Sequence, residues 1–330
     1  MAMKQNETVL DIDQLSLKLK TERGTFTAVN QVSFQIGAGE TVALVGESGC
    51  GKSVTSLSIM GLISKKTGEL GGSIRFKEKV LNRLSEREMR EIRGRDISMI
   101  FQEPMTSLNP VHTIGKQIDE VYRLHTNLTK QERRAKTIEM LRKVGIPRPE
   151  SIVNEFPHQL SGGMKQRVMI AIAMACEPDL LIADEPTTAL DVTIQAQILD
   201  LMNDLKQTAQ TAILLITHDL GVVAEMADRV MVMYYGQIVE EADVRTIFAN
   251  PKHPYTIGLL QSIPSIEEET SRLKPIEGNV PILGEVQAGC PFYSRCDHAV
   301  EKCKSEKPPV VLTGKHSVRC WVYQDKEVAI

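Results

Sequence analysis

The stretch GESGCGKS at residues 46–53 constrains the fold more than any other segment of this chain. It matches the pattern G-x-x-x-x-G-K-[ST] and lies between an apolar strand-like segment, 40–46, and a segment predicted to be helical, about 51–63. A glycine-rich turn in that setting presents backbone N–H groups at the positive end of a helix, where phosphate binds. The sequence therefore predicts a phosphate loop, with an ordinary glycine-rich surface turn as the alternative.

The predicted loop assigns chemistry to particular residues. Its glycines allow the backbone to close around a β-phosphate, Lys52 would neutralise β- and γ-oxygens, and Ser53 would hold Mg²⁺. The candidate nucleotide-binding residues of this segment are Gly46, Glu47, Ser48, Gly49, Cys50, Gly51, Lys52, Ser53 and Val54.

The order of apolar and amphipathic segments predicts the fold class. Short apolar segments alternate with helical ones, which is typical of an α/β protein with a mostly parallel sheet. From about 104 to 178 the pattern is helical, so we expect a helical insert in the α/β core. After about 250 the composition shifts to Pro, Lys, Glu and Cys, which indicates a linker or loose appendage. The predicted strands beyond the phosphate loop are 72–76, 97–102, 179–186, 212–219 and a pair with a Tyr-Gly turn within 229–240.

Polar side chains follow three of the predicted core strands: Asp184 and Glu185 after LLIA, Gln102 after ISMIF, and His218 after AILLIT. Beside a phosphate loop, Asp184 would hold Mg²⁺ through water and Glu185 would polarise the attacking water. His218 would contact the γ-phosphate, and Gln102 would touch Mg²⁺ or that water. A helix cap or a hydrogen-bonded core residue is the less specific alternative for such positions.

The stretch LSGGMKQR at 160–167 places a hydroxyl and two glycines at the start of the apolar helical run VMIAIAMA. Each glycine costs about 1 kcal/mol relative to alanine inside a helix, so two of them need a compensating role. Ser161 could be an ordinary N-cap. Alternatively, Ser161, Gly162 and Gly163 leave bare N–H groups at a helix N-terminus, which favours binding of a phosphate.

Composition argues against several other classes. The chain has 39 Lys and Arg against 42 Asp and Glu, a formal net charge of −3, so no basic nucleic-acid-binding domain is indicated. Aromatic residues make up 4%, too few for a base-stacking surface. We expect no signal peptide, and no apolar run approaches the roughly 20 residues of a spanning helix. The sequence therefore predicts a cytosolic protein that can serve a membrane as a peripheral subunit.

The motifs occur together in one order: phosphate loop, Gln102, LSGGMKQR, LLIADEP, ALD at 189–191 and THD at 217–219. In this combination they resemble the ATP-binding cassette (ABC) ATPases over about residues 8–250. The resemblance implies an α/β fold with a phosphate-loop, RecA-like core, a nucleotide-binding domain over 1–250 and a helical subdomain at about 104–178. It implies ATP and Mg²⁺ as cofactors, the metal being held by Ser53, Gln102 and Asp184.

In this family two cassettes pair head to tail. The resemblance implies that LSGG binds the γ-phosphate held by the partner's phosphate loop, and that Asp191 lines the dimer interface. It also implies that Gln102 and the following loop, 103–115, sense membrane subunits, although that loop could be an ordinary strand-to-helix connection. Many cassettes stack adenine on an aromatic residue about two dozen positions before the phosphate loop. Here Thr21 to Arg23 occupy that region and Phe26 is the nearest aromatic residue, so base stacking is not assigned.

Four of the six cysteines crowd the C-terminal segment. Their spacing, C-x5-C-x6-C-x16-C, is neither that of zinc ribbons nor that of bacterial ferredoxins. In a cytosolic chain such a cluster indicates one metal site, zinc or iron–sulfur, rather than disulfides, with unrelated free thiols as the alternative. The four candidate ligands are Cys290, Cys296, Cys303 and Cys320.

The segments NPKHPYTIGLLQSIP, GCPFYSRCDHAVEKC and VRCWV resemble the C-terminal extension of oligopeptide, dipeptide and nickel importer ATPases. The resemblance implies that 251–330 form this extension and that its cysteines hold a [4Fe–4S] cluster, with zinc as the alternative.

The same resemblance implies ATP-driven uptake of di- or oligopeptides at the cytoplasmic face of the membrane. The implied partners are a second, different ATPase chain, two transmembrane permease subunits and an extracytoplasmic solute-binding protein. Nickel or a metal chelate is the alternative cargo. A cassette ATPase that acts on nucleic acid or ribosomes is a rival class, which the single cassette and acidic balance disfavour.

Overall fold

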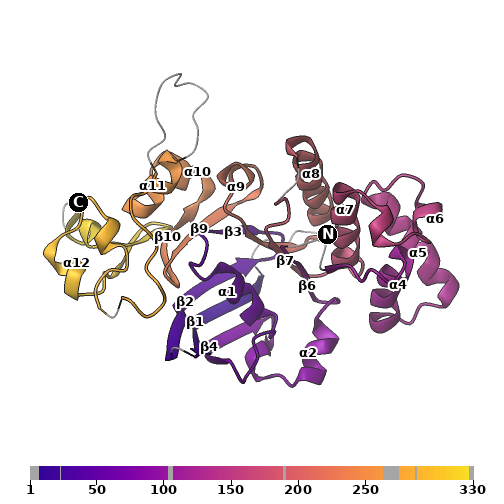
Figure 1. Ribbon diagram of the computed structural model, residues 1–330, viewed down its shortest axis with the longest axis horizontal. Helices are drawn as coiled ribbons and strands as arrows, with labels where there is room; N and C mark the ends of the chain where they lie inside the picture. Colours follow the sequence, from indigo (N-terminus) through magenta and orange to yellow (C-terminus); the bar gives the residue numbers. More distant parts are fainter. Residues whose placement is uncertain are drawn as a thin grey trace. The chain divides into compact units, whose positions relative to one another are not determined.

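The computed structural model describes residues 7–22, 24–102, 107–188, 191–262, 275–286 and 288–326 (Figure 1). They divide into two compact units. The signature unit, which contains LSGG, comprises the described residues of 7–10, 35–40 and 76–215, and the phosphate-loop unit comprises those of 11–34, 41–75 and 216–326. Several predicted features lie outside the described residues: Arg23, 103–106 of the loop after Gln102, 189–190 of ALD, and 263–274 of the linker.

Continuously apolar strands form the centre of the signature unit. β6 (Ile97–Ile100), β7 (Leu180–Asp184) and β8 (Ala212–Ile216) lie in the order β8-β7-β6. Every residue of β7 and β8 is buried, as expected of strands covered on both faces. β6 and β7 run parallel with Ile100 opposite Ala183, so the residues that follow the two strands emerge at the same edge.

Between β6 and β7 the described chain is helical (Figure 1). α7 packs against β6, α4 and α5. The predicted Thr cap of α5 is confirmed as a capping box between Thr129 and Glu132, and Gly145 follows the helix with φ 71°. The helices of this unit are α2 (Glu86–Ile92), α4 (Ile114–His125), α5 (Lys130–Lys143), α6 (Pro149–Ile152), η2 (Pro157–Gln159), α7 (Gly162–Met174) and α8 (Val192–Ala209), with η1 (Leu81–Arg83) and the short strand β5 (Lys79–Val80) before α2.

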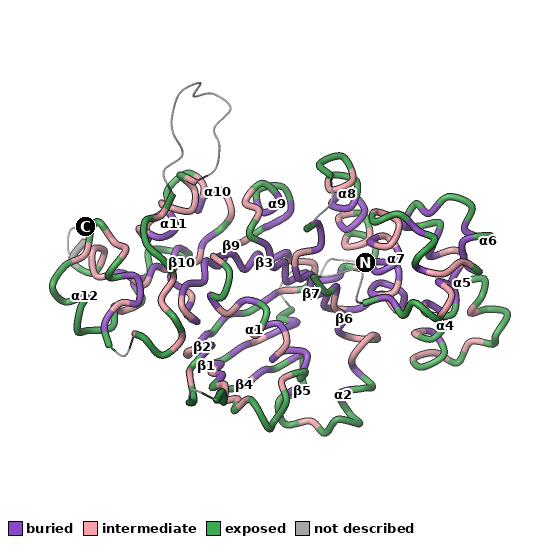
Figure 2. Tube along the Cα trace, viewed as in Figure 1, coloured by how far each residue is buried: buried purple, intermediate pink, exposed green. Residues whose placement is uncertain are grey.

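In the phosphate-loop unit, β3 (Thr41–Val45) leads into the phosphate loop and α1 (Lys52–Ile59), as predicted. The strand order is β11-β12-β10-β9-β3, and Figure 2 shows the buried trace along β3 and β9. β3 and β9 (Arg229–Tyr234) are parallel, but β9 and β10 (Gln237–Asp243) form an antiparallel hairpin. The predicted strand pair with its Tyr-Gly turn is confirmed, and this turn, with φ 47° and 77°, reverses the chain, so the sheet is mixed at this end rather than parallel throughout.

A second sheet of this unit has the order β2-β1-β4. β1 (Thr8–Thr21), β2 (Gly24–Gly37) and β4 (Gly68–Phe76) contribute to it, and only part of β4 was predicted. Gln14 in β1 and Gln31 in β2 have φ 50° and 51°, which interrupts the alternation of apolar and polar residues by which strands are recognised.

The C-terminal part of the chain is built onto this unit and is not a loose appendage. β12 (His316–Arg319) pairs antiparallel with β10, and β11 (Val310–Thr313) pairs with β12. The segment NPKHPYT, predicted as linker, begins helix α11 (Pro254–Gln261), in which Tyr255 is fully buried. The remaining helices are α9 (Leu220–Met226), α10 (Val244–Ala249), η3 (Tyr293–Arg295), α12 (Glu301–Ser305) and η4 (Trp321–Lys326). Among the described residues no helix is both long and apolar enough to span a bilayer.

Candidate functional site

Glycines determine the path of the phosphate loop. Gly46, Gly49 and Gly51 have φ of 151°, 80° and 114°, which side-chain-bearing residues rarely adopt. A Cβ on Gly46 would collide with the carbonyl oxygen of Met233, and one on Gly51 would lie 3.0 Å from that of Ala28. A Cβ on Gly49 would meet nothing within 4 Å. Two of the glycines therefore fit the loop against β9 and β2, while the third faces open space.

Lys52 is buried, and its ammonium group lies inside the loop. Nζ donates hydrogen bonds to the carbonyl oxygens of Gly46, at 2.6 Å, and Glu47, at 3.0 Å. α1 begins at Lys52 with Gly51 as a cap that supplies no side chain, and its described first turn has no acidic residue. Ser53 is exposed beside it. A cation next to the N-terminus of a helix is an arrangement suited to phosphate.

In the signature unit, Gln102 and Glu185 meet at the edge where β6 and β7 end. Gln102 Nε2 donates to Glu185 Oε2 at 2.9 Å, and Thr188 Oγ1 donates to the same oxygen at 2.9 Å. Glu185 has φ 49°, in the left-handed region, whereas Asp184 before it is buried as the last residue of β7. Gln102 and the two acids, each predicted to follow a core strand, therefore emerge at the same edge of the sheet.

The LSGG segment has features of both interpretations of its sequence, the helix N-cap and the exposed helix N-terminus. Ser161 caps α7, since its Oγ accepts the N–H of Met164 at 3.3 Å. Ser161 and Gly162 are nevertheless exposed, and a Cβ on Gly162 would meet nothing within 4 Å. Gly163 is closer to its surroundings, since a Cβ added there would lie 3.0 Å from the side chain of Ile194. Among the described residues of this unit none lies close enough to require glycine at 162, so the helix N-terminus is open to an external group.

Two further predicted residues have local roles in the structure. Asp191 is the N-cap of α8, where its Oδ1 accepts the N–H of Ile194 at 2.9 Å. His218 is exposed in the turn between β8 and α9. The capping role of Asp191 does not exclude a role in an interface, because the residue is exposed.

Phe26, the nearest aromatic residue to the expected adenine position, lies at the start of β2 and is partly buried. It lines a cavity of about 270 Å³ together with Tyr235, Gln237, Gly284 and Lys307. This cavity is therefore bordered both by the β1–β2 turn region and by the C-terminal segment. Stacking of a base on Phe26 stays unassigned.

All six cysteines are free thiols, and the four C-terminal ones line a single small cavity of about 10 Å³. Burial raises the pKa of Cys290 to about 12 and that of Cys320 to about 11, and it also raises the pKa of Cys296. In the described ranges, no group of three or more His, Cys, Asp or Glu side chains is placed so that it could hold a metal ion. The thiols thus converge, but they do not form a closed ligand set.

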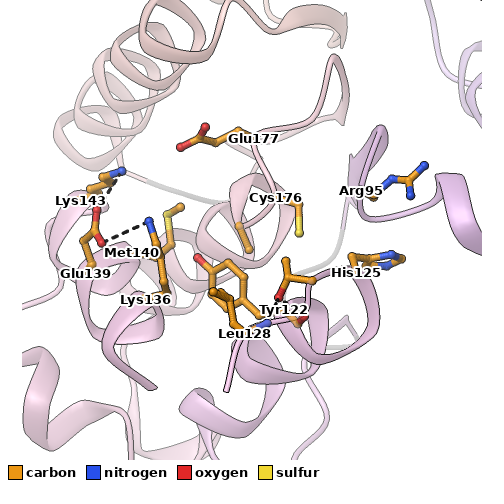
Figure 3. A pocket seen from close by; sticks show the side chains of 12 residues that line it. Arg95, Tyr122, His125, Leu128, Lys136, Glu139, Met140, Lys143, Cys176 and Glu177 are labelled. Atoms are coloured by element: carbon orange, nitrogen blue, oxygen red, sulfur yellow. Dashed lines mark hydrogen bonds and ion pairs between the residues drawn. The ribbon is translucent and has the colours of Figure 1, made fainter. Parts of the chain in front are cut away.

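Another cavity, of about 280 Å³, lies among α4, α5 and the end of α7 (Figure 3). Tyr122 and Cys176 point into it, and Glu139 pairs with Lys136 and Lys143 at one side. None of the residues predicted from the motifs lines this cavity. Its volume alone is therefore no reason to assign it to nucleotide binding.

Sequence reasoning missed two residues that contact the phosphate loop: Tyr255 of α11 and Arg295 of η3. Both lie more than 200 positions from their partner, Glu47. Arg295 immediately precedes Cys296 within the cysteine-rich segment. No sequence pattern, however, predicts that this segment contacts the phosphate loop.

Comparison with known proteins tests the motif assignment. Residues 29–188 match the family model described as ABC transporter. A relative from Bacillus subtilis (strain 168), oligopeptide transport ATP-binding protein AppD, is 55% identical over 97% of this chain and 98% of its own length. The chain belongs to the ATP-binding proteins of the ABC transporter family. The resemblance inferred from the motifs is thereby confirmed.

Other matches agree with this ABC ATPase assignment. Residues 239–303 match the model described as oligopeptide/dipeptide transporter, C-terminal region. The dipeptide transport ATP-binding protein DppD of B. subtilis is 50% identical over 97% of this chain and 96% of its own. The solved structure of the dimeric cassette MJ0796 in a post-hydrolysis state with ADP and Pi is 28% identical, with a TM-score of 0.64, and covers 72% of this chain and 99% of that one.

Proposed function

We propose that this ABC ATPase binds and hydrolyses ATP to energise the import of di- or oligopeptides. The observation that carries the proposal is the match over almost the entire chain to transport ATP-binding proteins named for oligopeptides and dipeptides. The C-terminal match to the oligopeptide/dipeptide transporter region supports the same cargo class. We propose 1–250 as the nucleotide-binding domain, with the helical subdomain at about 104–178, and 251–330 as the transporter-type extension.

The site residues act in defined roles. Lys52 and the N–H groups of 46–54 would bind the β- and γ-phosphates, and Ser53, Asp184 and Gln102 would hold Mg²⁺, which would offset phosphate charge. Glu185 orients the attacking water and accepts its proton, and His218 steadies the γ-phosphate. The hydrogen bonds from Gln102 and Thr188 to one oxygen of Glu185 support this role, because they fix the direction of the carboxylate.

Two cassettes complete each site. Ser161, Gly162 and Gly163 of this chain contact the γ-phosphate bound by the partner's loop, and Asp191 lies at that interface. The exposure of Ser161 and the open space at Gly162 support this arrangement. The partner is a second, different ATPase chain. The pair lies at the cytoplasmic face of the membrane and works with two permease subunits and an extracytoplasmic solute-binding protein.

Two measurements test the proposed import function: uptake of labelled cargo by cells, and identification of the proteins that are recovered with the tagged chain. A strain that lacks the chain is complemented with the wild type or with Lys52→Ala, and uptake of a labelled dipeptide, a labelled pentapeptide and ⁶³Ni²⁺ is measured. Peptide uptake restored only by the wild type supports the proposal. Restored nickel uptake alone would replace the cargo, and recovery of the tagged chain with ribosomes or DNA instead of permease subunits would reject transport.

We also propose that Cys290, Cys296, Cys303 and Cys320 hold a [4Fe–4S] cluster, with zinc as the alternative. Their convergence on one cavity supports a shared group, and the raised thiol pKa values mean that a cation is needed to stabilise the thiolates there. The cavity admits little more than one water molecule, so a four-iron cluster requires the thiols to separate further than they do here.

Metal analysis of anaerobically purified protein decides between these groups. Iron and acid-labile sulfide in equal amounts are expected for the cluster, and zinc without sulfide for the alternative. Cys303→Ser should lose either group, whereas the matched control Cys176→Ser, outside the cluster, should retain it. Wild-type protein without iron or zinc would refute the proposed site.

A further inference from the structure

The phosphate loop carries a carboxylate, Glu47, next to the first of its glycines. An anion at this position works against the binding of a triphosphate, because like charges a few ångströms apart repel strongly where water is partly excluded. In the structure Glu47 is paired with Arg295 by two hydrogen bonds. Arg295 Nη1 donates to Oε2 at 2.7 Å and Nη2 donates to Oε1 at 3.0 Å, the bidentate geometry that makes such pairs strong.

Arg295 is held in place by contacts other than Glu47. Its side chain is 3% exposed, and its Nε donates to the carbonyl oxygen of Glu277 at 2.9 Å. The guanidinium carbon lies 5.9 Å from the ring centre of Tyr234 and 5.8 Å from that of Phe292, within cation–π range. An arginine guanidinium does not lose its proton in proteins, so Arg295 brings a full positive charge to Glu47.

Tyr255 fixes the backbone of the same loop residue. Its hydroxyl accepts the N–H of Glu47 at 2.7 Å. The ring packs against Tyr234 and Phe292, with centroids 4.6 and 5.5 Å away. Two residues of the segment after position 250 therefore hold Glu47: Arg295 binds its side chain and Tyr255 binds its backbone N–H.

A buried carboxylate anchors that segment to the sheet. Glu240 of β10 is fully buried and accepts the N–H groups of Lys252, at 2.6 Å, and His253, at 2.8 Å, just before α11. Nε2 of His316 in β12 lies 2.7 Å from Glu240 Oε1. These contacts place both the start of α11 and the β12 hairpin, so Tyr255 has little freedom to leave the loop.

We propose that Arg295 and Tyr255 are positioning residues for the phosphate loop, and that the C-terminal segment thereby sets the affinity for nucleotide. Arg295 neutralises the loop's own carboxylate, and Tyr255 fixes the backbone that precedes the phosphate-binding N–H groups. The inference rests on the proposed binding of ATP at this loop.

The test is MgATP binding to the purified full-length chain by isothermal titration calorimetry. Arg295→Met leaves Glu47 unpaired beside the phosphates and should raise the Kd about tenfold or more, since removal of one partner of a partly buried pair strands the other charge. Glu47→Gln/Arg295→Met removes both charges and should return the Kd to within about threefold of the wild type. Tyr255→Phe should raise the Kd more modestly, by about three- to fivefold.

Controls separate positioning from loss of fold. Arg75→Met removes an exposed arginine that pairs with Asp11 at 3.9 Å in the same unit, and its Kd should equal that of the wild type. Arg295→Lys keeps the charge but not the bidentate geometry, and should give a Kd between those of the wild type and Arg295→Met. Thermal melting without nucleotide reports folding of each variant.

The outcomes distinguish the possible failures. Absence of ATP binding by the wild type would reject the proposed function itself. An unchanged Kd in Arg295→Met and Tyr255→Phe, with normal wild-type binding, would overturn the positioning role. A double variant as weak as Arg295→Met would also overturn the charge argument, because that result is expected of lost packing rather than of an unpaired carboxylate.

Discussion

Glu47 and Glu185 lie in the nucleotide motifs, and hydrogen bonds from other side chains hold the carboxylate of each. Glu47 is neutralised by Arg295, whereas Glu185 is directed by Gln102 and Thr188. Glu185 also has a left-handed backbone conformation, φ 49°, which is costly for a residue with a side chain and is found preferentially at functional sites. This strained residue follows directly on the buried β7, which Asp184 ends.

Substitution Glu185→Gln should leave ATP binding intact and lower the hydrolysis rate by about 100-fold or more, because the amide cannot accept the proton of the attacking water. The rate is measured on the chain assembled with its partner subunits, and binding on the chain alone. Thr188→Val, which removes one hydrogen bond but keeps the carboxylate, is the matched control and should retain most activity. Normal turnover by Glu185→Gln would remove that residue from the proposed role.

Gly162 offers a test in which stability and function change in opposite directions. Gly162→Asp adds an acidic side chain at the N-terminus of α7, which stabilises a helix by about 0.3–1 kcal/mol, and a Cβ at this position would meet nothing within 4 Å. The melting temperature of the chain should therefore stay constant or rise. ATP-dependent dimerisation should be lost, since the added charge repels the partner's γ-phosphate.

Gly162→Ala is the uncharged control for this prediction. It should melt at least as high as the wild type and retain more dimer than Gly162→Asp in light scattering with MgATP. Equal dimerisation of the aspartate variant and the wild type would contradict the role proposed for LSGG.

Helix α11 shows how one short element connects the C-terminal segment with the phosphate loop. Its N-cap is His253, whose Nδ1 accepts the N–H of Tyr255 at 3.1 Å. The imidazole is 2% exposed, and burial lowers its pKa to about 3. Protonation would both place a charge in the core and remove the acceptor that caps the helix.

Stability of the chain should consequently fall in mild acid. Between the ordinary histidine pKa of about 6.5 and the folded value of about 3, the unfolded state binds the proton and the folded state does not. The free energy of unfolding therefore decreases as the pH falls through this window, by about 1 kcal/mol from pH 7 to 5.5.

Urea titrations across that pH range measure the effect. His253→Asn keeps a capping oxygen but cannot ionise, so its unfolding free energy should depend less on pH. His158→Asn, at an exposed position, serves as the control. The same pH dependence in His253→Asn and the wild type would contradict the assignment to His253.

For the assembled protein, the proposal of two shared sites predicts a dependence on concentration. At a fixed amount of this chain, the rate of ATP hydrolysis should rise as the partner ATPase is added, until every phosphate loop is paired with the LSGG of a partner. Addition of Gly162→Asp chains, which bind ATP but complete no partner site, should lower the rate. A rate that is constant at all concentrations of the partner would mean that this chain alone suffices.

Local sequence signals were sufficient for the motifs and for their immediate settings. The strand–loop–helix around Lys52, the capped helix after Thr129 and the buried strand before Glu185 all follow from patterns within about ten residues. They could be predicted because glycine conformation, capping and apolar runs are local properties. The interrupted hairpin of β1 and β2 could not, since Gln14 and Gln31 break the alternation.

The chemistry and the family thus followed from the order of short motifs, whereas the surroundings of the phosphate loop depended on distant pairings. The partners of Glu47 lie 208 and 248 positions away, and the segment that carries them has a polar composition that indicated little structure. It is ordered because Glu240, buried in β10, accepts hydrogen bonds from both His253 and Lys252. A buried charge requires such partners, but which backbone groups supply them is decided only when the chain has folded around it.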